Sequence, residues 1–275
     1  MKFPDIAVLL LAWMGLSPLG ANAQVFMRPI DNAANLALGG ATVAAPDRLR
    51  GLANDAQLAL GQGSAVFAGT ALPFSLGGWQ AHQFQAVWKP DANSGVGVEV
   101  LHAGLESYLE QQFRASYGRK LGDKLLMGVH AQYLRVSAQE YGTAGGVSGG
   151  LSLLAEPIPQ LWLGARIQHP FGVELAGLRL PARLQLGAAW RSSETLLLLL
   201  EADKDIERPA QVKAGLEYAP TPAVRIRAGV RSEPARPAFG AGFRLKNGLT
   251  LDAGTEWHPN LGLTPAFMVS WQKEK

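Results

Sequence analysis

The strongest constraint on the fold is a strict alternation of side chains with a period of two. In residues 223–231, arginine or glycine occupies every odd position from 225 onward, whereas valine, isoleucine or alanine occupies the even positions. An α-helix would scatter these arginines around its surface, but a strand places them on one face. The segment therefore predicts a β-strand with one polar face and one apolar face.

The same alternation recurs throughout residues 63–275. Divided among 14 strands, this region allows about 15 residues for a strand and its connection, and a tilted membrane strand needs about 9–11. We therefore expect an all-β fold, an antiparallel transmembrane β-barrel of about 14 strands, whose even number lets both termini lie in the periplasm. The predicted strands are centred near residues 67, 84, 98, 113, 130, 149, 165, 186, 199, 214, 227, 241, 253 and 268.

Aromatic residues recur just ahead of the predicted turns. They end the second, fourth, eighth, tenth and fourteenth predicted strands, whereas the sixth lacks one and the twelfth carries Phe243. Tryptophan and tyrosine form girdles at the two membrane interfaces of such barrels. We predict that these residues mark the periplasmic rim, and that Tyr133 and Trp257 belong to the outer girdle. The periplasmic set is Trp88, Tyr117, Trp190, Tyr218 and Trp271.

Composition excludes several classes of function. The mean hydropathy is +0.06, and no apolar run after the first 24 residues is long enough for a membrane helix. The net charge of +3 is dispersed, which argues against nucleic-acid binding. The chain has no cysteine, its five histidines lie far apart, and no phosphate-binding loop is present. We expect neither a metal nor another cofactor.

The N-terminal region differs from the rest. Lys2, the apolar stretch Ile6–Leu16 and the small residues of 21–23 form a signal peptide, with cleavage expected after Ala23 and delivery to the outer membrane. Residues 24–62 are expected to form a plug inside the barrel or a periplasmic cap beneath it, with a short helix within Pro46–Leu60. In either position the backbone polar groups need partners, because irregular chain cannot face lipid.

Charged residues share the inward parity of the later strands. They allow two interpretations: a path that prefers anions, as arginine rings do in pores, or a paired network that fills the lumen. We favour the paired network, because acids and bases are nearly balanced and an unpaired buried charge is costly. Many other inward positions are glycine or alanine, which leaves room for a plug or a narrow ligand path. The candidate lumen residues are Arg166, Arg183, Lys213, Glu217, Arg225, Arg227, Arg231, Arg244, Asp252 and Glu256.

One short motif could indicate an enzyme. Residues 146–150 fit the pattern G-x-S-x-G around Ser148. A nucleophile elbow needs a strand, a sharp turn and a helix, with His and Asp near the serine. Here the motif lies in a glycine-rich β segment with no helix after it, so we interpret it as a chance match. A barrel esterase would rest on Ser148 alone, and we expect no catalytic site.

Two short motifs carry a family resemblance. The run Leu38-Gly39-Gly40-Ala41, with Val43 and Ala44, and the run Asn54-Asp55-Ala56 with Leu58 resemble the opening of the FadL-like superfamily of outer-membrane barrels, and especially its small PorV/PorQ-type members. Those proteins typically have proline where this chain has Asp55. The resemblance implies a 14-stranded barrel with an N-terminal plug, and for the PorV/PorQ type an association with type IX secretion.

Two functions remain open. The first hypothesis is a non-enzymatic accessory or docking component of an envelope or secretion system, motivated by the short connections between strands. The longer ones are expected at residues 139–146, 170–180 and 203–209. The alternative is a FadL-like channel for passive uptake of small hydrophobic molecules. Expected partners are outer-membrane lipid and either envelope proteins or a small hydrophobic ligand.

Overall fold

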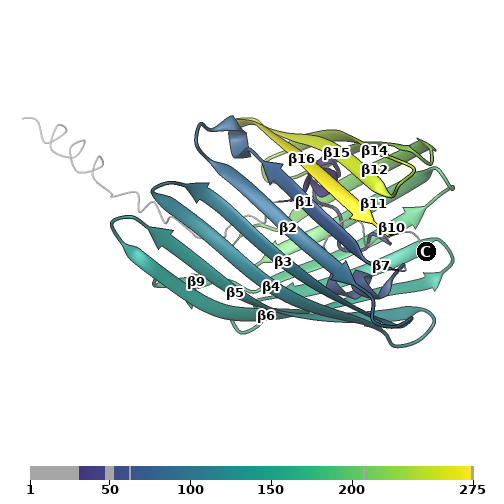
Figure 1. The fold of residues 1–275 in the computed structure, drawn as a ribbon, viewed down its shortest axis with the longest axis horizontal. Coiled ribbons are helices and arrows are strands. Elements are labelled where there is room, and N and C mark those ends of the chain that lie inside the picture. The colour runs from purple at the N-terminus through teal and green to yellow at the C-terminus, as the bar shows by residue number, and fades with distance from the viewer. Residues whose placement is uncertain (1–30, 47–52, 62, 207, 274–275) are drawn as a thin grey trace, which may run out of the picture.

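Fourteen antiparallel strands form a closed barrel in the computed structural model (Figure 1). The structure describes residues 31–46, 53–61, 63–206 and 208–273. The predicted signal peptide lies outside the described residues. Each predicted strand centre falls within a barrel strand, so the predicted fold class is confirmed. The barrel strands are β1 (Ala65–Ala71), β2 (Gln80–Trp88), β3 (Ser94–Leu105), β4 (Tyr108–Lys120), β5 (Leu125–Ala138), β6 (Gly142–Ile158), β7 (Leu161–Gln168), β10 (Arg183–Arg191), β11 (Leu196–Asp205), β12 (Gln211–Thr221), β13 (Val224–Arg231), β14 (Arg236–Arg244), β15 (Leu249–His258) and β16 (Gly262–Gln272).

The first and last strands close the barrel. Strand β1 pairs with β2 on one side and with β16 on the other, from Ala65 opposite Gln272 to Ala71 opposite Ala266. The beginning of β1 and the end of β16 therefore lie at the same end of the barrel. We call this the periplasmic end, because outer-membrane barrels keep their termini and short turns there, and the opposite end the extracellular end.

The outer face of the barrel is apolar. Large hydrophobic side chains such as Phe84, Phe113, Leu200, Phe239 and Phe267 are each more than two-fifths exposed, whereas their chain neighbours point into the lumen. Soluble monomeric proteins rarely expose so continuous an apolar surface to water. The closed barrel and this surface together indicate an outer-membrane location. Within the described part of the chain, no helix is long and apolar enough to cross a membrane.

The connections differ from the expectation in two places. Residues 142–146 and 203–205 belong to strands β6 and β11, because these strands continue to pair with β5 and β10 beyond the predicted ends. The connections there shrink to residues 139–141 and 206–210. Residues 170–180 instead contain a small hairpin, β8 (Val173–Leu175) with β9 (Leu178–Leu180), which lies at the extracellular end.

The N-terminal region forms a plug inside the barrel. Its described parts are residues 31–46 and 53–61, which contain α2 (Ala33–Ala37) and the 3-10 helix η2 (Asp55–Ala59) (Figure 1). Of the helix expected within Pro46–Leu60, residues 47–52 lie outside the described residues and the described part contains η2; α2 was not anticipated. The side chains of Asn32 and Asn54 cap the two helices by accepting hydrogen bonds from backbone N–H groups, which satisfies donors that short helices leave free.

Candidate functional site: the plugged lumen

The plug lies directly against glycines of the barrel wall. A Cβ atom built at Gly95 would lie 2.0 Å from the Leu58 carbonyl oxygen, and one at Gly118 would lie 2.5 Å from that of Asp55. Glycine therefore allows plug backbone to approach where any side chain would collide. The inward glycines that the sequence left unassigned accommodate the plug. They are Gly95, Gly118, Gly128, Gly164, Gly187, Gly215, Gly229, Gly240 and Gly254, each on a different strand.

Asp55 is the centre of the first ionic contact between plug and wall. Its carboxylate accepts hydrogen bonds from Ser116 Oγ at 2.9 Å and Arg114 Nη2 at 3.3 Å, and lies 2.7 Å from His130 Nδ1. Arg166 Nε lies 3.9 Å away, while Nη1 of the same side chain donates to the Ala53 carbonyl at 2.8 Å. These wall residues come from β4, β5 and β7. The cluster therefore ties η2 to one side of the barrel.

The Asp55 carboxylate has no access to solvent. Burial alone would raise its pKa, but Arg114 and Arg166 outweigh burial, and His130 adds to their effect, so the pKa lies well below its usual range. The carboxylate is therefore ionised at neutral pH, and it balances two guanidinium groups that are themselves buried.

Glu201 forms the second contact. One carboxylate oxygen accepts hydrogen bonds from the plug backbone N–H groups of Thr42 and Val43, at 2.8 and 2.9 Å. The other accepts from Lys213 Nζ at 2.7 Å and Gln185 Nε2 at 2.9 Å. Charge-assisted bonds of this kind are stronger than neutral ones. Glu201 on β11 therefore fixes the middle of the plug through its backbone.

A third contact holds the beginning of the described plug. Arg231 Nη2 lies 2.8 Å from Asp31 Oδ2, and Arg231 Nε lies 2.7 Å from Glu256, which also accepts from Arg236. Because Arg231, Arg236 and Glu256 lie on β13, β14 and β15, this contact is on the side of the barrel that packs against α2. The plug is therefore fixed on opposite sides of the lumen and in its middle.

The predicted lumen residues all lie on inward positions, and most are paired. Arg227 lies 2.7 Å from Glu217 and 2.5 Å from Asp252, and Lys213 lies 2.7 Å from Asp203, which also binds Arg183. These contacts favour the paired network over an anion-selective path. Arg225 and Arg244 lie near the periplasmic ends of β13 and β14 and are partly buried.

The predicted girdle residues all lie on the outer face. The aromatic side chains of the periplasmic set, with Tyr133 and Trp257 near the extracellular end, are between 37% and 58% exposed. Such an orientation is required of a membrane girdle, and their role at the interface stays a prediction.

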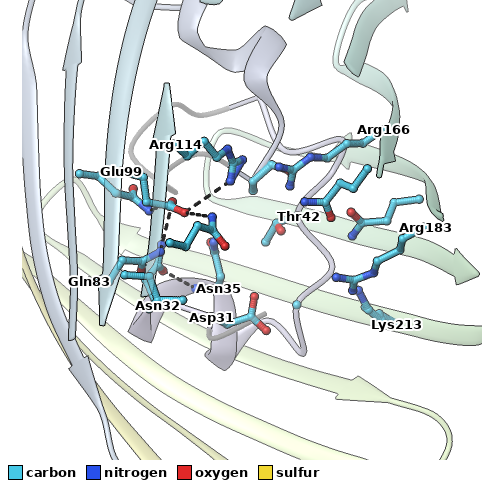
Figure 2. A pocket seen from close by; sticks show the side chains of 17 residues that line it. Asp31, Asn32, Asn35, Thr42, Gln83, Glu99, Arg114, Arg166, Arg183 and Lys213 are labelled. Atoms are coloured by element: carbon cyan, nitrogen blue, oxygen red, sulfur yellow. Dashed lines mark hydrogen bonds and ion pairs between the residues drawn. The ribbon is translucent and has the colours of Figure 1, made fainter. Parts of the chain in front are cut away.

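A small cavity lies between the plug and the extracellular end (Figure 2). Its volume is about 100 Å³, and only Gly40, Ala53 and Leu101 of its lining are without polar side chains. Pockets for apolar ligands are lined mainly by hydrophobic side chains, so this layer of the lumen differs from such a pocket. Figure 2 shows Arg183 and Lys213 on one side of the cavity, with Glu99 and Gln83 on the other.

An apolar cluster lies on one side of the extracellular mouth, beyond this cavity. The β8–β9 hairpin buries Val173, Leu175 and Leu180 against Leu134 and Val136 on the inner face of β5. Nearby, Phe171 remains 93% exposed. The hairpin therefore covers part of the inner face of β5 at the extracellular mouth, and a molecule that moves inward from there meets the polar layer and then the plug.

Ser148 lies beside a histidine. Its Oγ is 2.7 Å from His169 Nδ1, and the His169 backbone N–H donates to the Gly149 carbonyl. Burial and the nearby His130, Arg166, Arg183 and Arg114 lower the pKa of His169 to about 4. A catalytic histidine must become an imidazolium, and burial together with the nearby guanidinium groups opposes that charge. The hydrogen bond instead ties the first residue of the hairpin connection to β6.

Sequence reasoning predicted Arg166 and Arg231 as lumen residues but missed several other residues of the contacts between plug and wall. Asp55, Arg114, His130 and Glu201 were not candidates, although the last three have the inward parity of their strands. One signal was available: Asp55 departs from the proline of the resembled motif. Among the described residues, no group of three His, Cys, Asp or Glu side chains is placed to hold a metal ion.

Comparisons with known proteins identify the architecture. No protein-family model and no curated protein matches the sequence. Among solved structures, the CymD monoaromatic hydrocarbon channel matches with a TM-score of 0.72 at 12% identity, covering 89% of this chain and 98% of that one. The Ralstonia pickettii toluene transporter TbuX matches with a TM-score of 0.70 at 14% identity, covering 91% and 100%. A Pseudomonas aeruginosa FadL homologue gives 0.62 at 12% identity, covering 90% and 100%.

These likenesses show that the chain has the fold of FadL-type channels. They support the FadL-like resemblance at the level of the fold alone, whereas the narrower PorV/PorQ-type assignment finds no support among them.

Proposed function

We propose that this protein is a plugged outer-membrane channel for passive uptake of small hydrophobic molecules. The observation that carries the proposal is the likeness over about nine-tenths of the chain to barrels described as a monoaromatic hydrocarbon channel and a toluene transporter. Of the two functions that the sequence left open, this likeness supports the channel rather than the secretion accessory.

The geometry is compatible with such a channel. The exposed side chain of Phe171, beside the hairpin, provides an apolar surface where a hydrophobic molecule can leave water. Below it, the plug contacts most barrel strands through glycines and three ionic contacts. Passage along the lumen therefore requires that part of the plug move, since the plug backbone fills the space beside these glycines.

Uptake by whole cells tests the proposal. The full chain is produced in the outer membrane of cells that lack a related channel, and initial uptake of labelled toluene is compared with cells that produce an unrelated barrel at the same level. Faster uptake that persists after the cells are de-energised supports a passive channel. Equal uptake, with the barrel shown by heat-modifiable gel migration to be folded in the membrane, contradicts it.

A further inference from the structure

The polar layer of the lumen contains an unusual number of side-chain amides. Together with Arg114, Arg166, Arg183 and Lys213 they surround the cavity, so a molecule held there is surrounded by hydrogen-bonding groups. A buried polar group that loses its partner typically costs about 1–3 kcal/mol. A hydrocarbon therefore suits this layer poorly. The amides are those of Asn32, Asn35, Gln83, Gln85, Gln112, Gln168 and Gln185.

Most of these groups are engaged with neighbours. Gln83, Gln85 and Gln112 each donate a hydrogen bond to Glu99, and Gln185 donates to Glu201. Gln168 differs from them, because its amide makes no hydrogen bond with the described residues. The side chain is only partly buried and lines the cavity. It therefore offers a free donor and a free acceptor.

Arg183 lies directly beside this amide. It faces Gln168 in the register of β7 and β10, and side chains directly opposite each other on neighbouring strands have Cβ atoms about 5 Å apart. The Arg183 guanidinium binds Asp203 through Nε and Nη2, which fixes its orientation and leaves Nη1 unused by that pair. In Figure 2 the Arg183 side chain extends from the wall toward the plug residue Asp31.

A hydroxyl group matches this pair, since it donates one hydrogen bond and accepts others. It can donate to the Gln168 amide oxygen while it accepts from Arg183. A methyl group of similar size can do neither. The cavity of about 100 Å³ is of the same order as a protein cavity of roughly 150 Å³ that binds benzene, so a single aromatic ring is an appropriate size.

We propose that Gln168 and Arg183 form a hydroxyl-binding subsite, so that this channel selects small hydroxylated aromatic molecules over hydrocarbons of the same shape. This inference rests on the proposed channel function and narrows its substrate class. Phenol and toluene are the matched probes, because they differ by a hydroxyl in place of a methyl group.

Equilibrium dialysis of the full chain in lipid nanodiscs tests the subsite, with binding to empty nanodiscs subtracted. We expect phenol to bind roughly tenfold more tightly than toluene, the factor for one hydrogen bond of about 1.4 kcal/mol. Gln168→Met should remove most of this preference by weakening phenol binding, with toluene binding unchanged. Gln85→Met is the matched control on the opposite wall, because Glu99 keeps its contacts with Gln83, Gln112 and Arg114.

Three outcomes overturn the subsite: toluene binding as tightly as phenol, neither probe binding, or the two variants weakening phenol equally. The uptake experiment separates this failure from failure of the channel itself. If cells take up toluene through the protein and the purified protein does not prefer phenol, the channel function stands and the hydroxyl subsite is wrong.

Discussion

Position 55 shows how one residue can keep a local structure and add a long-range contact. Asn54 caps η2, so Asp55 occupies the first helical position, where proline is also favoured because no backbone donor is needed there. Aspartate at this position preserves the start of the helix, and its carboxylate binds Arg114, Ser116 and His130. The departure from the resembled motif therefore adds an ionic contact that ties η2 to the wall.

Removal of the Asp55 carboxylate should release this part of the plug. In Asp55→Asn, two buried guanidinium groups lose their shared counter-charge, and breaking a buried ion pair typically costs roughly 3–5 kcal/mol. Asp55→Pro should act similarly, although it suits the helix start. Hydrogen exchange of residues 53–61 in lipid measures the effect. Asp123→Asn, the same change in an exposed turn, is the control, and it should leave the free energy of opening that exchange reports within about 0.5 kcal/mol of the parent protein. If Asp55→Pro kept residues 53–61 fully protected from exchange, the carboxylate would be dispensable.

At the scale of elements, the strands could be predicted and the contacts between plug and wall could not. Alternation located all the barrel strands, because each inward residue in the sheet requires an outward neighbour in lipid. The hairpin β8–β9 was not predicted, because each of its strands has three residues, which are too few to show an alternation of polar and apolar side chains. The partners of Asp55 and Glu201 were not predicted, because the alternation shows whether a residue faces the lumen but not where it lies along the barrel axis relative to the plug.

The inward glycines allow an element-scale test. Gly118→Ala would place a Cβ atom 2.5 Å from the Asp55 carbonyl oxygen and 3.0 Å from the Leu58 Cβ atom. We expect η2 to shift, with a loss of about 1–3 kcal/mol as for other overpacked sites, measured as faster hydrogen exchange of residues 53–61. Gly122→Ala is the control in the adjacent turn, where an added Cβ atom meets nothing within 4 Å. Equal exchange in the two variants would contradict a close contact at Gly118.

At the scale of the whole molecule, the lumen forms three successive layers. The hairpin forms an apolar cluster on one side of the mouth, amides and paired charges form a polar middle, and the plug closes the periplasmic side. Composition could not reveal this order, because the same inward charges serve an open path or a closed network equally well. Only the register between strands and plug shows that Lys213 and Arg231 are engaged by carboxylates.

A covalent link between plug and wall tests whether passage requires the plug to move. A Cβ atom at Gly187 would lie 3.6 Å from the Ala44 Cβ atom, within the usual range for a disulfide of about 3.5–4.5 Å. The chain has no cysteine of its own, so Ala44→Cys with Gly187→Cys introduces a single possible bridge. Oxidation should reduce toluene uptake by cells at least roughly tenfold if the plug is the main barrier, and reduction should restore it.

The reduced double variant is the control for the added side chain, because a cysteine at position 187 also approaches Val43 and the Leu200 carbonyl. Any effect of that crowding is present in both redox states, so their difference reports the bridge alone. Complete disulfide formation with unchanged uptake would mean that molecules pass without displacing this part of the plug. The contact with Glu201, which holds the adjacent residues Thr42 and Val43, would then be structural only.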